Sequence, residues 1–439
     1  MPPFQTLRYD EDYSFLRNDS PDDLLDQIKY IALGADDVYL SVGGEIRERY
    51  EIYDHSLWGQ GPQDNNGYLL QRYMLHTDLH LSPFIRVFAQ LKSGLEDGRN
   101  GGPRPTDEDR LDFNQAFVDF RAADDVRWSL VTRVGRQELL YGSSRLIAVR
   151  DGPNVHQSFD GLREILKLQN WQVDFIAVEP VKTHNGPSLF DDGNDPNQRL
   201  WGSYAVSTLP ILPGGHIDIY YLGYLREHAQ FDHGSGREER ESFGTRIWGT
   251  ANGWDYNFES LYQGGRFGSD EISAWSVASD TGYTWTEAPD HPRLGLKADI
   301  VSGDRNPNGD TLGTFNALFP RGAYFNESAL IGPANIIDLH PSLSLQPDPG
   351  LTITFDTDFY WRESVYDGLY GFAGNLIRSG KNVPGRRIGT QPSVTPEWRP
   401  NRHWTFYASY AYFVSGPFIR ESGPGKNINY FTIWSVFKF

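Results

Sequence analysis

Apolar and polar residues alternate along this chain in repeated runs of about ten residues, and this feature limits its fold most strongly. The alternation is clear at 39–52 (YLSVGGEIRERYEI), 69–81 (LLQRYMLHTDLHL) and 84–92 (FIRVFAQLK), and it returns at 216–221, 293–300 and 353–362. Successive side chains of a strand point to opposite faces, so each run predicts a strand with one apolar and one polar face. Strands of soluble proteins average only ~5–6 residues, whereas ~9–11 residues cross a bilayer. The pattern predicts an all-β fold, a transmembrane antiparallel β-barrel, with a sheet of a soluble β-protein as the alternative.

The length of the chain sets the size of this barrel. Roughly 400 residues follow the N-terminal segment, and about 22 residues for each strand with its connection give about 18 strands, inside the range of bacterial outer-membrane barrels. The last run, YFTIWSVFKF at 430–439, alternates in the same way and ends on Phe439. A terminal strand of this kind resembles the recognition signal of outer-membrane barrels.

Composition agrees with strands rather than helices. The chain is 38% hydrophobic with a mean hydropathy of −0.53, and no segment approaches the ~18–20 apolar residues of a spanning helix. Aromatic residues make up 14%, and 45 Gly and 27 Pro supply turns. A barrel spreads its hydrophobicity over alternate residues, so its membrane signal is weak in such averages.

Charge and cysteine content narrow the classes of function. The net charge of −18 argues against nucleic acid as a partner, because its binders need a basic surface. The chain has no cysteine, which excludes disulfides and is compatible with passage through an oxidising periplasm. We expect an export signal to have been removed and the protein to lie in the outer membrane of a Gram-negative bacterium, in contact with its lipid.

Residues 1–38 differ from the barrel region predicted for 39–439. The sequence Ser20-Pro21-Asp22-Asp23 is typical of a helix N-terminus, and Leu24, Leu25 and Ile28 then suit a short amphipathic helix. Such a periplasmic segment could lie at the mouth of the barrel or plug it, and packing against a soluble core is the alternative.

A basic stretch at 127–167 suggests what the barrel carries. It holds seven basic residues against four acidic ones, in a strongly acidic chain. If Trp128 and Val134 face lipid, then Arg133 faces the lumen, because it lies on the other face of the strand. Exposed arginines on the edge of a soluble protein are the alternative.

Further arginines fall on predicted inward faces or beside turns. Guanidinium groups in a low-dielectric wall attract anions and offer two parallel hydrogen bonds to a carboxylate. Pairing with inward acids such as Asp119 and Asp358 is the structural alternative for any single arginine. The predicted pore-lining residues are Arg47, Arg49, Arg72, Arg133, Arg136, Arg145, Arg150, Arg163 and Arg362, with Asp119 and Asp358 as acidic partners.

Motifs for catalysis and metal binding are weak. No nucleophile, zinc-protease, P-loop or dinucleotide motif is present, so we expect neither an enzyme nor a cofactor. The segment 302–310 (SGDRNPNGD) resembles the first half of a calcium loop, with Asp304, Asn306, Asn308 and Asp310 at alternate positions. Phe315 stands where the calcium loop needs a glutamate, so a hydrogen-bonded loop is favoured over a structural calcium site.

Several blocks in the same order resemble the alginate-export family of outer-membrane proteins. They are LRYDEDYSFLR, DQIKYIALG, VYLSVGGEIRERYE, RVGRQELLYGSSRLI, VHQSFDGLR, SGDRNPNGDTLGTFNALFPRGAYF, NIIDLHPSL and FYWRESVYDGLY. The resemblance implies a monomeric barrel of 18 strands with an arginine-rich constriction for an anionic uronic-acid polymer. It also implies that Arg72, Arg133, Arg136, Arg145 and Arg362 form the constriction, with Asp119 and Asp358 beside them.

Three functions follow from this sequence. The first is an anion-selective channel that exports an alginate-like polysaccharide received from periplasmic assembly proteins. The second is an uptake porin for small carboxylates or other small solutes, and the third is a non-conducting adhesion or scaffold barrel. A movable periplasmic plug would suit a polymer, whereas a fixed constriction would suit small solutes.

Overall fold

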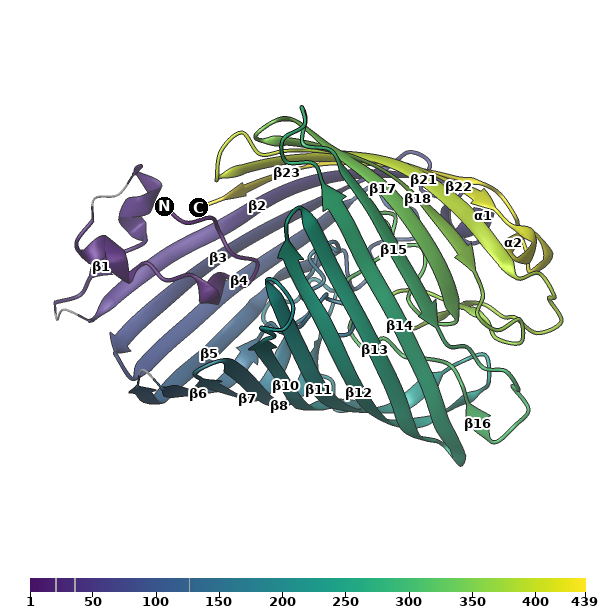
Figure 1. Cartoon of the computed structure of the whole chain (residues 1–439), viewed down its shortest axis with the longest axis horizontal. Helices are drawn as coiled ribbons and strands as arrows, with labels where there is room; N and C mark the ends of the chain where they lie inside the picture. Colours follow the sequence, from purple (N-terminus) through teal and green to yellow (C-terminus); the bar gives the residue numbers. More distant parts are fainter. Residues whose placement is uncertain (20–21, 35–36, 126) are drawn as a thin grey trace.

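The protein is a closed β-barrel with both termini at one end (Figure 1). The structure is a computed structural model that describes residues 1–19, 22–34, 37–125 and 127–439. Its 18 long strands each run antiparallel to two neighbours, and the ring closes where β2 pairs with β23 from Glu45 opposite Lys438 to Asp54 opposite Asn429. The predicted antiparallel barrel of about 18 strands is confirmed.

The barrel strands follow the chain in order. They are β2 (Tyr39–Asp54), β3 (Tyr68–Ser82), β4 (Ile85–Asp97), β5 (Asp109–Asp125), β6 (Trp128–Gln137), β7 (Phe159–Leu168), β8 (Trp171–Lys182), β10 (Gln198–Thr208), β11 (Gly215–Gln230), β12 (Ser235–Ala251), β13 (Trp254–Phe267), β14 (Asp270–Thr284), β15 (Arg293–Val301), β17 (Ile336–Asp348), β18 (Leu351–Trp361), β21 (Arg387–Trp398), β22 (Trp404–Ser415) and β23 (Ile428–Lys438). Short strands extend the wall or pair in loops: β1 (Ile31–Ala32), β9 (Gly193–Asn194), β16 (Thr311–Leu312), β19 (Leu369–Tyr370) and β20 (Leu376–Arg378).

The strands of the barrel wall show the predicted alternation of exposed apolar and buried polar side chains. In β2, Ile46 is 41% exposed, whereas the neighbouring Arg47 is 1% exposed. In β13, Phe258 and Tyr262 are exposed on the outside, while Leu261 between them is buried. An apolar outer face and a more polar inner face suit a wall between lipid and a lumen.

Connections differ in length between the two ends of the barrel. At the end with both termini, residues 252–253 join β12 to β13, and Asn252 and Gly253 both have positive φ, as a two-residue hairpin turn requires. At the other end, 138–158, 302–335 and 362–386 are long loops. Short periplasmic turns and long external loops are typical of outer-membrane barrels, so the end with both termini faces the periplasm.

The N-terminal segment lies at the periplasmic end and is fastened there. It contains the 3₁₀ turns η1 (Arg8–Asp10), η2 (Ser14–Arg17) and η3 (Leu25–Ile28). The amphipathic helix predicted here is absent from the described residues: Ser20 and Pro21 lie outside them, and Leu24 is 81% exposed instead of packed. Asp26 is buried and accepts a hydrogen bond from Arg402. This polar contact, rather than an apolar helix face, anchors the turn η3.

Helices are few elsewhere. The single turns α1 (Ser56–Gly59) and α2 (Pro417–Glu421) lie in external loops. None of the helices in the described ranges is both long and apolar enough to span a membrane.

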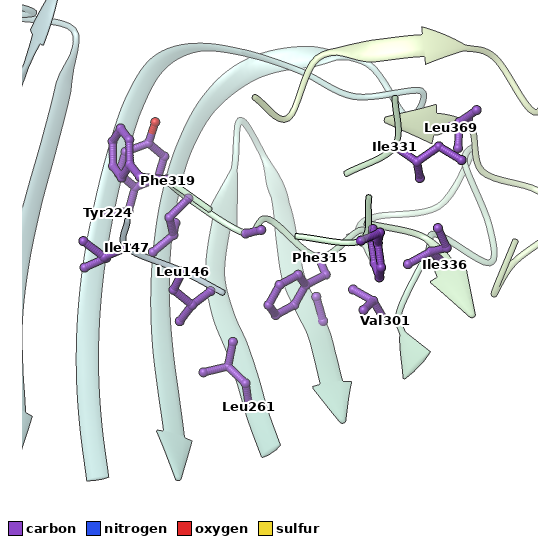
Figure 2. Packing of buried hydrophobic residues seen from close by; sticks show 14 of the residues in the cluster. Leu146, Ile147, Tyr224, Leu261, Val301, Phe315, Phe319, Ile331, Ile336 and Leu369 are labelled. Carbon is purple, nitrogen blue, oxygen red and sulfur yellow. The ribbon is translucent and has the colours of Figure 1, made fainter. Parts of the chain in front are cut away.

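The lumen contains a hydrophobic cluster, which the sequence did not predict (Figure 2). Loops 138–158 and 302–335 fold inward, and Ile147 pairs as a parallel bridge with Phe319. Both side chains are buried against wall residues such as Tyr224 and Leu261. Two loops with apolar residues therefore fill part of the interior, beside the arginines that the sequence predicts there.

Candidate functional site

The loop 138–158 narrows the lumen, and arginines of the wall hold it. Arg47 of β2 donates to the carbonyl oxygens of Asp151 (2.7 Å) and Pro153 (2.9 Å). Arg49 donates to the carbonyl oxygen of Gly152 at 2.8 Å. Backbone carbonyls accept these bonds, so the arginines fix the loop without neutralising their own charge at that contact.

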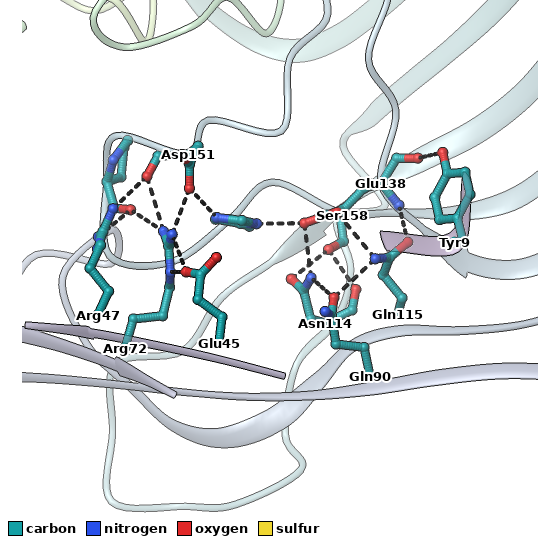
Figure 3. A network of polar contacts seen from close by, with 12 residues as sticks. Tyr9, Glu45, Arg47, Arg72, Gln90, Asn114, Gln115, Glu138, Asp151 and Ser158 are labelled. Atoms are coloured by element: carbon teal, nitrogen blue, oxygen red, sulfur yellow. Dashed lines mark hydrogen bonds and ion pairs between the residues drawn. The ribbon is translucent and has the colours of Figure 1, made fainter. Parts of the chain in front are cut away.

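A chain of charged groups continues from the wall into the loop (Figure 3). Arg72 of β3 contacts Glu45 at 2.5 Å and the Asp151 carboxylate at 2.6 Å. His156 then lies between Asp151 (3.0 Å) and Glu138 (2.6 Å). Each acid in this chain faces a basic group, so the loop is tied to β2 and β3 by charge as well as by backbone bonds.

Arg133 and Arg163 line the periplasmic part of the lumen but are paired. Arg133 forms two hydrogen bonds with Asp119, at 2.7 and 2.9 Å, and Arg163 contacts Asp174 at 2.5 Å. The ring of Tyr9, from the N-terminal segment, lies 4.0 Å from the guanidinium of Arg133. The N-terminal segment thus covers these arginines and occupies part of the mouth.

Arg145 fastens the opposite side of the loop. Its Nε lies 3.0 Å from Glu259 of β13, and its Nη2 lies 2.6 Å from Asp299 of β15. All three side chains are buried. Loop 138–158 is therefore held from two sides of the barrel.

Two predicted residues lie away from the open lumen. Arg136 shares a face of β6 with the exposed Val134 and pairs with Asp160 at 2.9 Å, so it lies on the outer side of the wall. Arg362 follows the end of β18 and donates to loop carbonyls, including that of Asp367 at 3.0 Å. These placements correct the pore-lining assignment of both arginines.

Asp358 also departs from its predicted role. It faces the lumen from β18, but its nearest charged neighbour is His340, at 2.9 Å, rather than an arginine. The imidazole comes from β17, the adjacent strand.

A cavity of about 300 Å³ remains open between the loop and the β2–β23 side of the wall. Six basic residues line it against four acidic ones. The basic residues are Arg47, Arg72, Arg150, Arg321, Arg399 and Lys438, and the acidic ones are Glu45, Asp151, Glu327 and Glu397. The cavity is therefore locally positive in a protein of net charge −18.

Arg150 is the most available cation of this cavity. No carboxylate of the described residues lies within ion-pair distance of it, and its hydrogen bonds to Pro320 and Gln157 are long, at 3.4 Å. Burial lowers the pKa of Arg150 to about 10, which leaves it charged at neutral pH. An anion entering the cavity could therefore form new charge-assisted hydrogen bonds with this side chain.

A second cavity, of about 170 Å³, lies on the other side of the loop and shares Arg321 with the first. The Arg321 side chain is 56% exposed and lies 3.7 Å from Glu327. Arg321, Arg399 and Lys438 were absent from the predicted set. Lys438 continues the alternation of the last strand and could have been found, whereas Arg321 lies in a loop without periodicity.

The predicted calcium loop is engaged in other contacts. The Asp304 carboxylate contacts His233 at 2.5 Å and accepts the backbone N–H of Asn306 at 2.9 Å. Asp310 offers its carbonyl oxygen to Glu271 at 2.9 Å. These contacts belong to a hydrogen-bonded loop, and calcium at Asp304, Asn306, Asn308 and Asp310 stays a prediction.

A closed wall with an apolar outside, long loops at one end and a partly blocked polar interior defines an outer-membrane β-barrel channel. The chain belongs to the alginate export family, whose model matches residues 38–432. Its fold and family are those of membrane channels. Among the curated proteins, none matches this chain.

Solved structures from Pseudomonas aeruginosa share the fold. OccD3 (OpdP) superposes with a TM-score of 0.61 at 13% identity, over 93% of this chain and 92% of that one. OpdK with vanillate superposes with a TM-score of 0.60 at 10% identity, over 91% of this chain and 98% of that one. OccK2 (OpdF) in complex with glucuronate superposes with a TM-score of 0.57 at 9% identity, over 93% of this chain and 99% of that one.

Proposed function

We propose that this protein is an anion-selective channel whose fixed constriction passes small carboxylated solutes. The observation that carries the proposal is Arg150, a charged side chain without a carboxylate partner among the described residues, in a cavity with a basic surplus. A planar guanidinium binds a carboxylate through two parallel hydrogen bonds, and a low-dielectric wall strengthens its field.

Aromatic rings beside the cavity supply a second kind of contact. Trp434 and Tyr407 line the cavity, with ring centroids 4.5 Å apart. Flat apolar faces next to fixed charges suit a solute that carries both a ring and a carboxylate. Glucuronate and vanillate, named with the OccK2 and OpdK structures, are carboxylates of this kind, which supports the proposed solute class.

The constriction is fixed rather than movable, and this supports small solutes over a polymer. Arg72 and Asp151 fasten loop 138–158 on one side, and Arg145 and Asp299 fasten it on the other. The buried Ile147 adds apolar packing between these anchors. Opening the loop for a polymer would break the buried Arg145–Asp299 pair, at a cost of about 3–5 kcal/mol, and also the Arg72–Asp151 pair, whose carboxylate is 56% exposed.

Passage of an alginate-like anionic polysaccharide is the second candidate, and family membership favours it. The two cavities meet at Arg321, so basic groups follow one another on both sides of the loop. In this case periplasmic assembly proteins would deliver the polymer to the end that carries the N-terminal segment.

Reversing the charge at Arg150 tests the proposal. In planar bilayers we expect the wild type to prefer anions, and Arg150→Glu to lose that preference, because a carboxylate then replaces the free cation of the cavity. Arg266→Glu is the matched control, since Arg266 is exposed on the outer side of β13. Equal ion selectivity of the wild type and Arg150→Glu would contradict the proposal.

Blocking experiments on the same channels separate the candidates. Monomeric glucuronate should reduce the current of the wild type, and Arg150→Glu should weaken this block. Block by oligouronate with no effect of the monomer would favour the polymer. A wild-type protein without measurable current would instead indicate a scaffold barrel.

A further inference from the structure

Three side chains on the inner face of the barrel meet at a point that the proposed channel function does not use. They are Asp338 and His340 of β17 and Asp358 of β18. One ligand atom from each lies within 4.8 Å of the others. The alternation of both strands directs all three inward, since Leu339 and Phe359 between them are paired on the other face.

One buried carboxylate of this cluster, that of Asp338, lacks a hydrogen-bond donor. Asp338 is 1% exposed and Asp358 is fully buried. No donor within the described ranges reaches either oxygen of Asp338, whereas one oxygen of Asp358 lies 2.9 Å from Nδ1 of His340. A buried carboxylate without a donor is costly, so the two oxygens of Asp338 face a partner that the polypeptide does not supply.

The imidazole of His340 is oriented as a metal ligand would be. Its Nδ1 lies 2.9 Å from Asp358 within the cluster, and its Nε2 lies 3.4 Å from the Asp356 carboxylate on the other side. Asp356 is itself held by the Ser393 hydroxyl, which donates to it at 2.5 Å. A carboxylate behind the distal nitrogen of a histidine is the usual support of a metal-binding imidazole.

The charge around the cluster matches a dication. Lys297 lies opposite His340 in the register of β15 and β17, and its ammonium donates to the carbonyl oxygen of Tyr324. Asp299, opposite Asp338 in the register of β15 and β17, is paired with Arg145 at 2.6 Å, which it shares with Glu259. A metal-bound imidazole is neutral, and the three carboxylates of Asp338, Asp356 and Asp358 then exceed the charge of Lys297 by two; without a metal, protonation of His340 reduces this excess to one.

We propose that Asp338, His340 and Asp358 bind one divalent transition-metal ion, with Asp356 as a positioning residue behind His340. Two carboxylate oxygens and one imidazole nitrogen are a ligand set that zinc accepts, with water completing a tetrahedral site. The ion would cross-link β17 and β18 next to Asp299, which anchors Arg145 and through it the constriction loop. This inference does not depend on which solute the channel passes.

Zinc titration of the whole folded protein tests the site. Protein in detergent micelles is stripped with EDTA, dialysed and titrated with zinc chloride in a calorimeter. We expect one zinc ion per chain, at least about tenfold weaker binding in Asp338→Asn and His340→Gln, and ~10- to 100-fold weaker binding in Asp356→Asn. Cobalt should give visible absorption bands of a tetrahedral site in the wild type but not in His340→Gln.

Two controls keep the result specific. His184→Gln alters the other potential metal group of the described residues, an exposed one with Asp191 and Asp192, and should leave the main affinity unchanged. Metal-free Asp338→Asn should be as stable as the wild type or more so, because it removes a buried charge without a partner. Absence of zinc binding in the wild type, or undiminished binding in folded Asp338→Asn, would overturn the proposal.

Discussion

At the scale of single residues, pairing decides which arginines can act on a solute. Arg72, Arg133 and Arg163 face inward, yet each contacts a carboxylate at 2.5–2.9 Å. Their role is to hold the wall and the loops in place. Arg150 differs because it lies in a loop that enters the cavity, and no carboxylate of the described residues comes within ion-pair distance of it.

His233 in the β11–β12 turn gives the external loops a dependence on pH. It lies between Asp270 at 3.0 Å and Asp304 at 2.5 Å. Although partial burial disfavours its charged form, these two carboxylates raise the pKa of His233 above its ordinary value of 6.5. The stabilisation is therefore complete below pH 6.5 and is lost as the pH rises through the raised pKa.

Thermal unfolding of the wild type and His233→Gln should show this dependence. We expect the wild type to be more stable at pH 6 and to lose much of that advantage at pH 9, because the neutral imidazole no longer pairs with both acids. The same difference in melting temperature at both pH values would show that the protonated histidine contributes nothing.

At the scale of elements, loop 138–158 depends on anchors in strands that are distant in sequence. Arg145 joins the loop to β13 and β15 through Glu259 and Asp299. The Ile147–Phe319 bridge joins it to loop 302–335. These contacts give the loop one position, although it has no regular structure of its own.

Removal of one anchor should loosen the constriction. Arg145→Ala leaves Glu259 and Asp299 buried without their cation, which costs about 3–5 kcal/mol. We expect larger fluctuations of the open-channel current and faster proteolysis within 138–158. Arg145→Lys keeps the charge, so its current fluctuations and its rate of proteolysis should lie between those of the wild type and those of Arg145→Ala. Unchanged current noise in Arg145→Ala would mean that the hydrophobic cluster alone holds the loop.

At the scale of the whole molecule, the outer surface and the closed ring place the barrel in the outer membrane. Ile433 lies at the centre of β23 and is 49% exposed, as expected of a side chain in contact with lipid. Strand β23 also closes the ring against β2. Stability therefore depends on the bilayer as much as on contacts within the chain.

A charge at Ile433 should weaken this contact. For protein folded into lipid vesicles, Ile433→Lys should lower the free energy of unfolding in urea by ~2–4 kcal/mol, because the midplane solvates an ammonium poorly. Ile211→Lys is the control, since Ile211 is 83% exposed in the turn between β10 and β11. An equal effect of both substitutions would argue against Ile433 facing lipid.

The sequence predicted part of the site, and the errors have physical causes. Alternation places Arg133 inward, and it also places Arg136, three positions later, on the opposite face. The prediction instead puts Arg136 beside a turn at Gly135, whereas β6 continues to Gln137. Arg362 continues the inward phase of β18, but the strand ends at Trp361 and the side chain turns into a loop. Arg321 was missed because it lies in a loop, where no alternation of apolar and polar residues indicates whether a side chain faces the lumen.

The sequence by itself determined the wall: period-two alternation fixes which side chains face lipid, and chain length fixes about how many strands close the ring. Only the tertiary structure decided how the lumen is filled. Loops 138–158 and 302–335 fold inward through contacts between residues more than one hundred positions apart, such as Arg145 with Glu259. Strand alternation is a local property that the sequence carries directly, whereas such distant pairings arise only when the barrel has closed.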